Sequence, residues 1–169
     1  EVALKSIPSL IIINEDNIKD FSKLLKIRLI GQVDNSVIES IKKNSLENNV
    51  EIIPYIPHEK VIAEQSSSEV LLLLMNNSAN AKGIMTGKIF EYMASGRPIF
   101  AIGPTDGDTA IIFDKTKSGF IVDFDDKDGM KNAIIDLFNK YKENQLITKK
   151  NEVVENYSRR ALAKDYVNL

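Results

Sequence analysis

The chain has 169 residues, of which 43% are hydrophobic and 27% are charged, and its formal net charge is −2, as is typical of one globular domain. It contains no cysteine and one histidine, which excludes disulfides, thiolate metal sites and polyhistidine metal sites. The charge gives no indication of nucleic-acid binding, and no apolar run reaches the roughly 18 residues that a membrane-spanning helix needs.

The N-terminal segment has two interpretations. Residues 1–13 are compatible with a helix despite Pro8, and this is the interpretation that we favour. The four aliphatic residues Leu10–Ile13 instead favour a first strand, because such residues are enriched in strands. The start of the chain, Glu1–Lys5, has neither an initiating Met nor the pattern of a signal peptide, so we expect a piece of a longer protein or a processed chain.

From there to the C-terminus, short apolar runs alternate with amphipathic segments, a pattern that predicts an α/β fold with a parallel sheet. The run Val70–Met75 is almost unbroken aliphatic, as expected of a strand covered on both faces. We expect strands near Lys26–Ile30, Val50–Ile53, Val70–Met75, Pro98–Ile102 and Gly119–Val122. We expect helices over Ser36–Asn44, Pro57–Gln65, Asp128–Tyr141 and Asn151–Leu169, and a turn over Ser66–Ser68.

The last predicted helix, Asn151–Leu169, has two contrasting faces. Its apolar residues are Val153, Val154, Tyr157, Leu162 and Tyr166, and its basic residues are Arg159, Arg160 and Lys164. An apolar face of this size favours self-association when nothing covers it. We therefore expect this helix to be only loosely attached to the rest of the chain, or to contact a second copy in a dimer.

The most informative stretch is Gly87–Ile99, which combines a glycine-led loop, a short helix and a turn into a strand. A helix is predicted to begin at Gly87 and to stop at Gly96. Lys88 and Glu91 are three residues apart and share one face, while the opposite face is apolar. The N-terminus of a helix attracts phosphate, and a carboxylate one turn further in can accept hydrogen bonds from sugar hydroxyls. The arrangement therefore suits a nucleotide-diphosphate sugar.

This stretch and several shorter ones resemble a known family. Together they are similar to the donor-binding half of retaining GT-B glycosyltransferases, the glycosyl transferases group 1 family, and most of all to its branch in bacterial surface-polysaccharide clusters. The resemblance covers most of the chain and is carried by Leu29–Val33, Val50–His58, Leu71–Leu74, Gly87–Ile99, Ala101–Pro104 and Ser118–Val122. Only Gly87–Ile99 is specific by itself, and the other segments support the resemblance through their order.

The resemblance implies a fold and a domain organisation. Residues 1–150 would form a Rossmann-like three-layer sandwich with a mainly parallel sheet, the nucleotide-sugar-binding C-terminal half of a GT-B enzyme. Residues 151–169 would form the terminal helix that crosses back to the N-terminal domain. Family members open this domain with a strand at the centre of the sheet, a basic loop and a helix. If residues 1–13 are that helix, the opening strand is missing.

The resemblance also assigns roles around the start of the predicted helix. Glu91 matches the glutamate that bonds the ribose of the nucleotide, and the alternative is a surface ion pair with Lys88. Lys88 either clamps a phosphate or is a solvated charge. Thr86 caps the helix, donates to a phosphate, or does both. Gly83 and Gly87 permit a ligand to approach the backbone closely.

One position departs from the family pattern. Many members carry a first glutamate, eight positions before the one that Glu91 matches, and that glutamate contacts the donor sugar. Here Gly83 stands at that position. The identity of the sugar is therefore open, and we expect the backbone amides around Ala81–Met85, that of Ile84 included, to take over the contact.

Further binding residues are expected where other strands end. Gly31 and Gln32 follow a predicted buried strand, at the edge where open α/β sheets bind ligands, although a plain strand-to-helix turn is equally compatible. Tyr55 follows the next strand, in the region that contacts the nucleotide base in the family, and alternatively its ring packs on the core. We expect one cleft to be surrounded by Gly31, Tyr55, Thr86, Gly87, Lys88 and Glu91.

Two features carry no predicted chemistry. His58 lies at a Pro-flanked helix start, and the family's catalytic histidine belongs to the other domain, so we assign it no catalytic role. The sequence Asp106-Gly107-Asp108 lacks the further ligands of a calcium loop and is predicted to be a turn with Asp108 at a helix N-cap. We therefore name no catalytic residue, no metal site and no cofactor, since the nucleotide-diphosphate sugar is a substrate.

The resemblance implies that the parent protein is a retaining glycosyltransferase, which transfers a sugar from a nucleotide donor to a saccharide or lipid-linked acceptor. This chain would be inactive alone, because its partner is the N-terminal acceptor domain of the same parent chain. We expect a cytoplasmic location, with peripheral association at the inner face of the membrane through the parent. The alternatives are one half of a nucleotide-sugar epimerase and a non-catalytic binding module.

Overall fold

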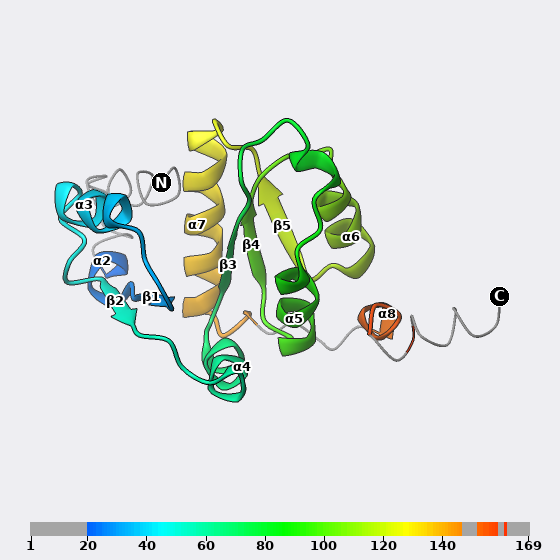
Figure 1. The fold of residues 1–169 in the computed structure, drawn as a ribbon, viewed down its shortest axis with the longest axis horizontal. Helices are drawn as coiled ribbons and strands as arrows, with labels where there is room; N and C mark the ends of the chain where they lie inside the picture. The colour runs from blue at the N-terminus through cyan, green and yellow to red at the C-terminus, as the bar shows by residue number, and fades with distance from the viewer. Residues whose placement is uncertain (1–19, 147–151, 159–160, 162–169) are drawn as a thin grey trace. The chain divides into compact units, whose positions relative to one another are not determined.

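The computed structural model describes residues 20–146, 152–158 and 161 (Figure 1). The helix predicted over residues 1–13, and the alternative strand Leu10–Ile13, lie outside these residues. Within the described part the α/β fold is confirmed, and no helix there is long and apolar enough to span a bilayer. In chain order the elements are α2 (Phe21–Leu24), β1 (Ile27–Ile30), α3 (Asn35–Lys43), β2 (Val50–Ile53), α4 (His58–Ser67), β3 (Leu71–Leu74), η1 (Ala81–Gly83), α5 (Gly87–Ser95), β4 (Ile99–Ile102), α6 (Asp108–Thr116), β5 (Gly119–Val122), α7 (Lys127–Lys142) and α8 (Glu152–Glu155).

The described strands form two sheets, where one mainly parallel sheet was expected. The chain divides into two compact units, Glu1–Val61 with Asp125–Phe138 and Ile62–Phe124 with Asn139–Leu169. In the first unit β1 pairs with β2, and in the second unit β3, β4 and β5 pair in that order. All of these pairings are parallel, as predicted.

In the first unit, β1 and β2 are in register with Ile27 opposite Val50. Apolar residues of both strands pack with α3 and with Ile134, in the middle of α7, around the buried side chains of Ile41 and Leu46. The rings of Phe21 and Phe138 meet edge to face, with centroids 5.1 Å apart. Helices α2, α3 and α7 therefore hold this small sheet, and its two parallel strands end at the same edge.

In the second unit, β4 is the central strand, and all four of its residues are buried because it has a neighbour on each side. Helices α5 and α6 pack on one face of this sheet (Figure 1). On the opposite face the rings of Phe100 and Phe120 stack, with centroids 5.2 Å apart. The apolar sequences of β3 and β4 are explained by this cover. The strands predicted over Val70–Met75 and Pro98–Ile102 are confirmed at Leu71–Leu74 and Ile99–Ile102.

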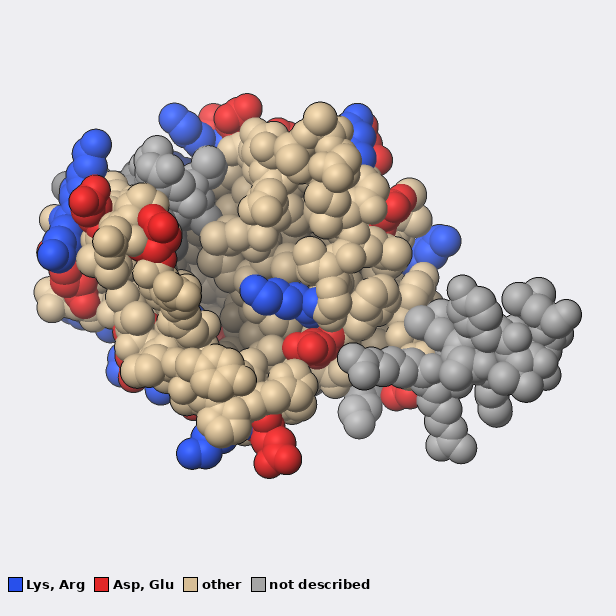
Figure 2. Space-filling model, in the orientation of Figure 1, with Lys and Arg blue, Asp and Glu red and all other residues tan. Residues whose placement is uncertain are grey.

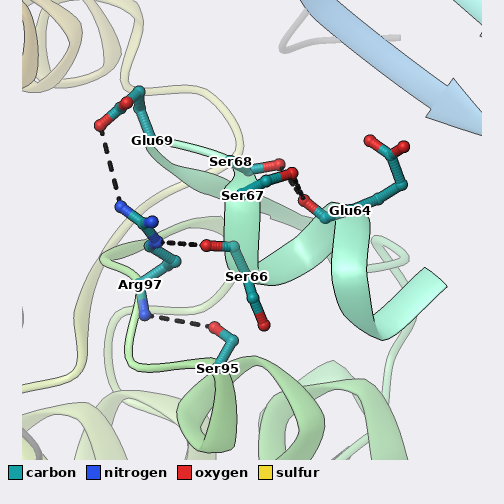
Figure 3. Close-up of polar contacts among 7 residues, drawn as sticks. All are labelled: Glu64, Ser66, Ser67, Ser68, Glu69, Ser95 and Arg97. Carbon is teal, nitrogen blue, oxygen red and sulfur yellow. Dashed lines mark hydrogen bonds and ion pairs between the residues drawn. The ribbon is translucent and has the colours of Figure 1, made fainter. Parts of the chain in front are cut away.

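Helix α4 continues past its predicted end at Gln65 into a run of serines that was predicted to be a turn. The hydroxyls of Ser67 and Ser68 donate to the carbonyl oxygen of Glu64 at 3.0 and 2.8 Å (Figure 3). Arg97 Nε donates to the carbonyl oxygen of Ser66 at 2.8 Å. The last carbonyls of a helix have no partner within it, so these donors stabilise the additional helical residues.

The C-terminal segment differs from the single helix predicted over Asn151–Leu169. Helix α8 ends at Glu155, and a turn follows it at residues 156–158. Val154 and Tyr157 pack against the buried cluster of the second unit, on the side of α5 and α6. Packing onto these helices, and not helical periodicity, decides the path here. The apolar face is thus covered in part by its own unit, and the contact with a second copy stays a prediction.

Candidate functional site

The N-terminus of α5 is the first candidate region. The helix begins at Gly87, as predicted, and ends at Gly96 in the left-handed conformation, with a φ of 71°. It follows β3 through the loop that contains η1, so its N-terminus lies at the carboxyl edge of the three-stranded sheet. A helix N-terminus presents free N–H groups and a partial positive charge. An anion bound at this edge of the sheet would accept hydrogen bonds from these N–H groups and would be attracted by the partial positive charge.

Thr86 takes the N-cap position of α5 with its backbone, and its carbonyl oxygen accepts from the N–H of Ile89 at 3.1 Å. Its hydroxyl does not cap the helix, because Thr86 Oγ1 is buried and has no hydrogen-bond partner among the described residues. Thr109 Oγ1, in the first turn of α6, is also buried and has no hydrogen-bond partner among the described residues. A buried hydroxyl without a partner costs about 1–3 kcal/mol. The predicted cap is therefore made by the backbone alone, and the hydroxyl has no partner among the described residues.

The loop before α5 leaves its backbone open. Gly83 ends η1, Ile84 follows it, and Gly87 begins α5. A Cβ atom built on Gly83 or on Gly87 would meet no other atom within 4 Å. Packing inside the unit therefore does not require glycine at these two positions. The same open space is what a ligand would need in order to approach the backbone.

Lys88 and Glu91 occupy the first turns of α5. The Lys88 side chain is exposed and that of Glu91 is partly buried. Neither has an ion-pair partner among the described residues, so the alternative of an ion pair between the two is not observed. Burial, and after it the negative charge of Glu91, raises the pKa of Tyr92. No described residue donates to the Glu91 carboxylate, which lies one turn into the helix.

Sequence reasoning missed the link between η1 and the start of α6. Lys82 Nζ lies 2.6 Å from Asp106 Oδ2, and this hydrogen bond holds the pKa of the Asp106 carboxyl below its usual value. Gly107 packs against the Lys82 backbone, where a Cβ would lie 2.7 Å from the carbonyl oxygen. Gly107, and not the predicted Asp108, is the N-cap of α6, and Asp108 is the first residue of the helix. The sequence did contain a signal for this link, because the loop with η1 follows β3, the loop before α6 follows β4, and these two strands are adjacent and parallel.

The second candidate region lies where β1 and β2 end. Gly31 has a φ of 106°, which disfavours any side chain, and its N–H donates to the carbonyl oxygen of Ile53 at 3.0 Å. Gln32 is exposed. The Tyr55 ring is 86% exposed, so the alternative that packs it on the core is wrong. An exposed aromatic ring at the carboxyl edge of a parallel sheet offers a flat surface for another ring system.

The predicted binding residues thus fall into two groups. One group belongs to the first unit and comprises Gly31, Gln32 and Tyr55. The other belongs to the second unit and comprises Gly83, Ile84, Thr86, Gly87, Lys88 and Glu91. Each group lies at the carboxyl edge of the sheet of its own unit. That the two groups surround one cleft remains a prediction.

The described residues contain no further cluster of chemical groups. His58 is exposed at the start of α4, and no three His, Asp or Glu residues in the described part are placed to hold a metal ion. On the face shown in Figure 2, basic and acidic side chains are interspersed among uncharged ones and are not gathered by sign. This face therefore offers individual charges to a small ligand and no extended basic surface.

Comparison with known proteins identifies the family of this chain. The model of the family described as glycosyl transferases group 1 matches residues 15–160. A search of curated proteins found no match. Among solved structures, the chain is similar to sucrose-phosphate synthase from Thermosynechococcus elongatus, with a TM-score of 0.66 and 16% identity. This similarity covers 98% of this chain and 41% of that one, so the chain spans less than half of that protein, and it concerns the fold. Because the family match extends over most of its residues, the chain belongs to the glycosyl transferases group 1 family.

Proposed function

We propose that the chain is the nucleotide-sugar donor-binding domain of a retaining glycosyltransferase. An acceptor-binding domain of the same parent chain would hold the saccharide or lipid-linked acceptor, on the cytoplasmic side of the membrane. Since transfer needs both partners, this chain alone binds the donor without turning it over. Family membership supports glycosyl transfer, and the N-terminus of α5 supports the donor role.

The observation that carries the proposal is the unpaired Thr86 hydroxyl at the N-terminus of α5. Proteins seldom leave a buried hydroxyl without a partner, and this one lies at a helix N-terminus, so it supports a polar ligand there. A diphosphate oxygen there would accept from this hydroxyl and from the free N–H groups of the first turn. The exposed Lys88 ammonium would add a positive charge without a fixed geometry.

The same groups would assist the reaction. In glycosyl transfer the bond between the sugar and the diphosphate breaks, and negative charge grows on the diphosphate oxygen that leaves. Donors and cations that already point at that oxygen stabilise the transition state more than the ground state. Glu91, one turn further along α5, would accept hydrogen bonds from the ribose hydroxyls. We assign no proton transfer to any residue of this chain.

Calorimetric titration with UDP and GDP tests the donor role. Glu91→Gln should weaken binding of the preferred nucleotide by about 1–3 kcal/mol, because a hydrogen bond to a charged group is lost. Glu143→Gln, which changes an exposed glutamate just after α7, is the matched control and should leave the affinity unchanged. Absence of nucleotide binding to the wild type would contradict the donor role. An unchanged affinity in Glu91→Gln would contradict the ribose contact.

The loop that contains Gly83 can be tested separately for sugar recognition. Gly83→Glu restores the glutamate that many family members carry, and the space around this glycine is open. We expect the affinity for free UDP or GDP to stay about the same and the affinity for the matching nucleotide sugar to change. A large change in the affinity for the free nucleotide would show that the loop does more than read the sugar.

Two other functions have less support. An epimerase needs carboxylates and a histidine for acid and base catalysis, whereas His58 is exposed and no described carboxylate is bonded to it. A non-catalytic binding module would not be required to bind UDP or GDP, so the titration above separates it from a donor domain. Turnover by the full-length parent, with sugar release or with formation of an epimer, separates the two enzymes.

A further inference from the structure

Helix α8 and the turn after it touch α5 beside the candidate site. Val154 and Tyr157 pack against the buried cluster that contains Ile89 and Met93 of α5. The rings of Tyr157 and Phe90 lie with centroids 6.3 Å apart and are tilted by 31°. Helix α8 also contacts α6. One short segment therefore braces both helices that cover this face of the three-stranded sheet.

The contact with Phe90 lies at the edge of the core contact of α5, because Phe90 itself packs against the same buried cluster. Successive residues of an α-helix are rotated by about 100°, so Phe90 lies about 100° from Ile89, and Glu91 lies about 100° further round. Ile89 is fully buried in the core. Tyr157 therefore contacts α5 between its buried stripe and the side that carries the Glu91 carboxylate.

A second contact at a different angle restrains the roll of a helix. A helix that packs on a sheet along one stripe can rotate about its own axis. Side chains extend about 5–6 Å from that axis, so a roll of about 10° moves a carboxylate by about 1 Å. A displacement of that size can cost an enzyme about 100-fold in rate. The position of Glu91 thus depends on whatever restrains the roll of α5.

We propose that Tyr157 is a positioning residue, which acts through Phe90 to hold α5 at the roll that directs Glu91 and the helix N-terminus towards the donor nucleotide. This inference rests on the proposed donor-binding function. It gives the C-terminal segment a role in the site of its own unit, in addition to any contact with a second copy or with the acceptor domain.

Three variants separate positioning from general stability. Tyr157→Ala removes the ring, and Tyr157→Phe keeps the ring and removes the hydroxyl. Phe120→Leu is the control, because it reduces the stacked pair on the opposite face of the same sheet. Each Kd for UDP and GDP is measured at a temperature where denaturant titration shows the protein folded. We expect Tyr157→Ala to weaken binding about 5–10-fold and the other two variants to stay within about 2-fold of the wild type.

Amide hydrogen exchange supplies a readout that needs no ligand. In the nucleotide-free protein, the amides of Glu91–Ser95 should exchange faster in Tyr157→Ala than in the wild type, Tyr157→Phe or Phe120→Leu. If Tyr157→Ala does not fold, Tyr157→Leu replaces it. An unchanged Kd and unchanged exchange in the folded Tyr157 variant overturn the proposal. Equal loss of affinity in Phe120→Leu also overturns it, because the effect would then be one of stability. If the wild type binds no nucleotide, the donor role fails, while the exchange data still decide whether Tyr157 restrains α5.

Discussion

The two ends of helix α5 are built in opposite ways. At the C-terminal end, the N–H of Gly96 donates to the carbonyl oxygen of Met93 at 3.2 Å, and the Ser95 hydroxyl donates to that of Tyr92 at 2.6 Å. At the N-terminal end, the Thr86 hydroxyl is buried and has no hydrogen-bond partner in the part of the chain that the structure describes. The chain therefore satisfies its own polar groups at one end of the helix and leaves them unsatisfied at the other.

Arg97 extends the bonded end to neighbouring segments (Figure 3). Its backbone N–H donates to Ser95 Oγ at 3.2 Å, and its Nε donates to the carbonyl oxygen of Ser66 at 2.8 Å. Its guanidinium also lies 3.9 Å from Glu69 Oε2. This end joins the last turn of α4 to the turn after α5, and so it stabilises the unit. Under the proposed function, the bonded end serves the fold and the unpaired end serves a ligand.

Among substitutions at the bonded end, Gly96→Ala is expected to change the free energy of unfolding most. Gly96→Ala should lower the free energy of unfolding by about 1–2 kcal/mol, because a Cβ is disfavoured in the left-handed conformation. Denaturant titration measures this loss. Gly96→Asn is the matched control, since Asn tolerates this conformation better than other residues with a side chain, and it should lose less. An equal loss in both variants would contradict the argument from backbone conformation.

Arg97→Ala should lower the free energy of unfolding by about 1 kcal/mol, because the carbonyl of Ser66 loses its donor. Arg97→Lys keeps the charge without the planar guanidinium and should recover only part of this loss. The affinity for UDP or GDP, measured by calorimetry on the folded variants, should not change. A weaker affinity in Arg97→Ala would break the comparison, because the bonded end would then also serve the ligand.

Thr86→Val should act in opposite directions on stability and on binding. Removal of an unpaired buried hydroxyl should raise the free energy of unfolding by up to about 1 kcal/mol, while the affinity for the nucleotide falls. Thr86→Ser, which keeps a hydroxyl, is the control for the binding effect. Denaturant titration and calorimetry on the same preparations measure the two quantities. A loss of stability together with unchanged affinity would show that the hydroxyl serves the fold.

The smallest expected effect concerns the ion pair of the loop before α5. The hydrogen bond from Lys82 lowers the pKa of Asp106 from its usual 3.8. A carboxylate whose folded-state pKa is lowered stabilises the fold above the pKa of the unfolded state and loses that contribution as the pH falls through the folded-state pKa. Asp106→Asn should therefore be slightly less stable than the wild type at neutral pH, and the difference should vanish in acid. Denaturant titrations across the acid range measure it, and a difference that persists at low pH would contradict this assignment.

Local patterns in the sequence were enough to predict a large part of the molecule. The parallel α/β fold, the strands around β3 and β4, and the bounds of α5 follow from hydrophobic runs, helix periodicity and the glycine that ends the helix. These signals lie within a few residues of the structure they determine. The candidate residues at the N-terminus of α5 come from the same predicted helix start together with the family resemblance, and their role in binding stays a prediction.

Tertiary structure decided what depends on partners distant in the sequence. Arg97 extends α4 into a predicted turn, Lys82 and Asp106 join η1 to α6, and Tyr157 sets the path of the C-terminal segment. The unpaired Thr86 hydroxyl belongs to the same class, because its burial and its lack of a donor or acceptor depend on everything packed around it. The sequence by itself determined most of the elements, whereas hydrogen bonds between segments far apart along the chain decided how α4 ends and how the C-terminal end of α5 is bonded, since no local propensity encodes them.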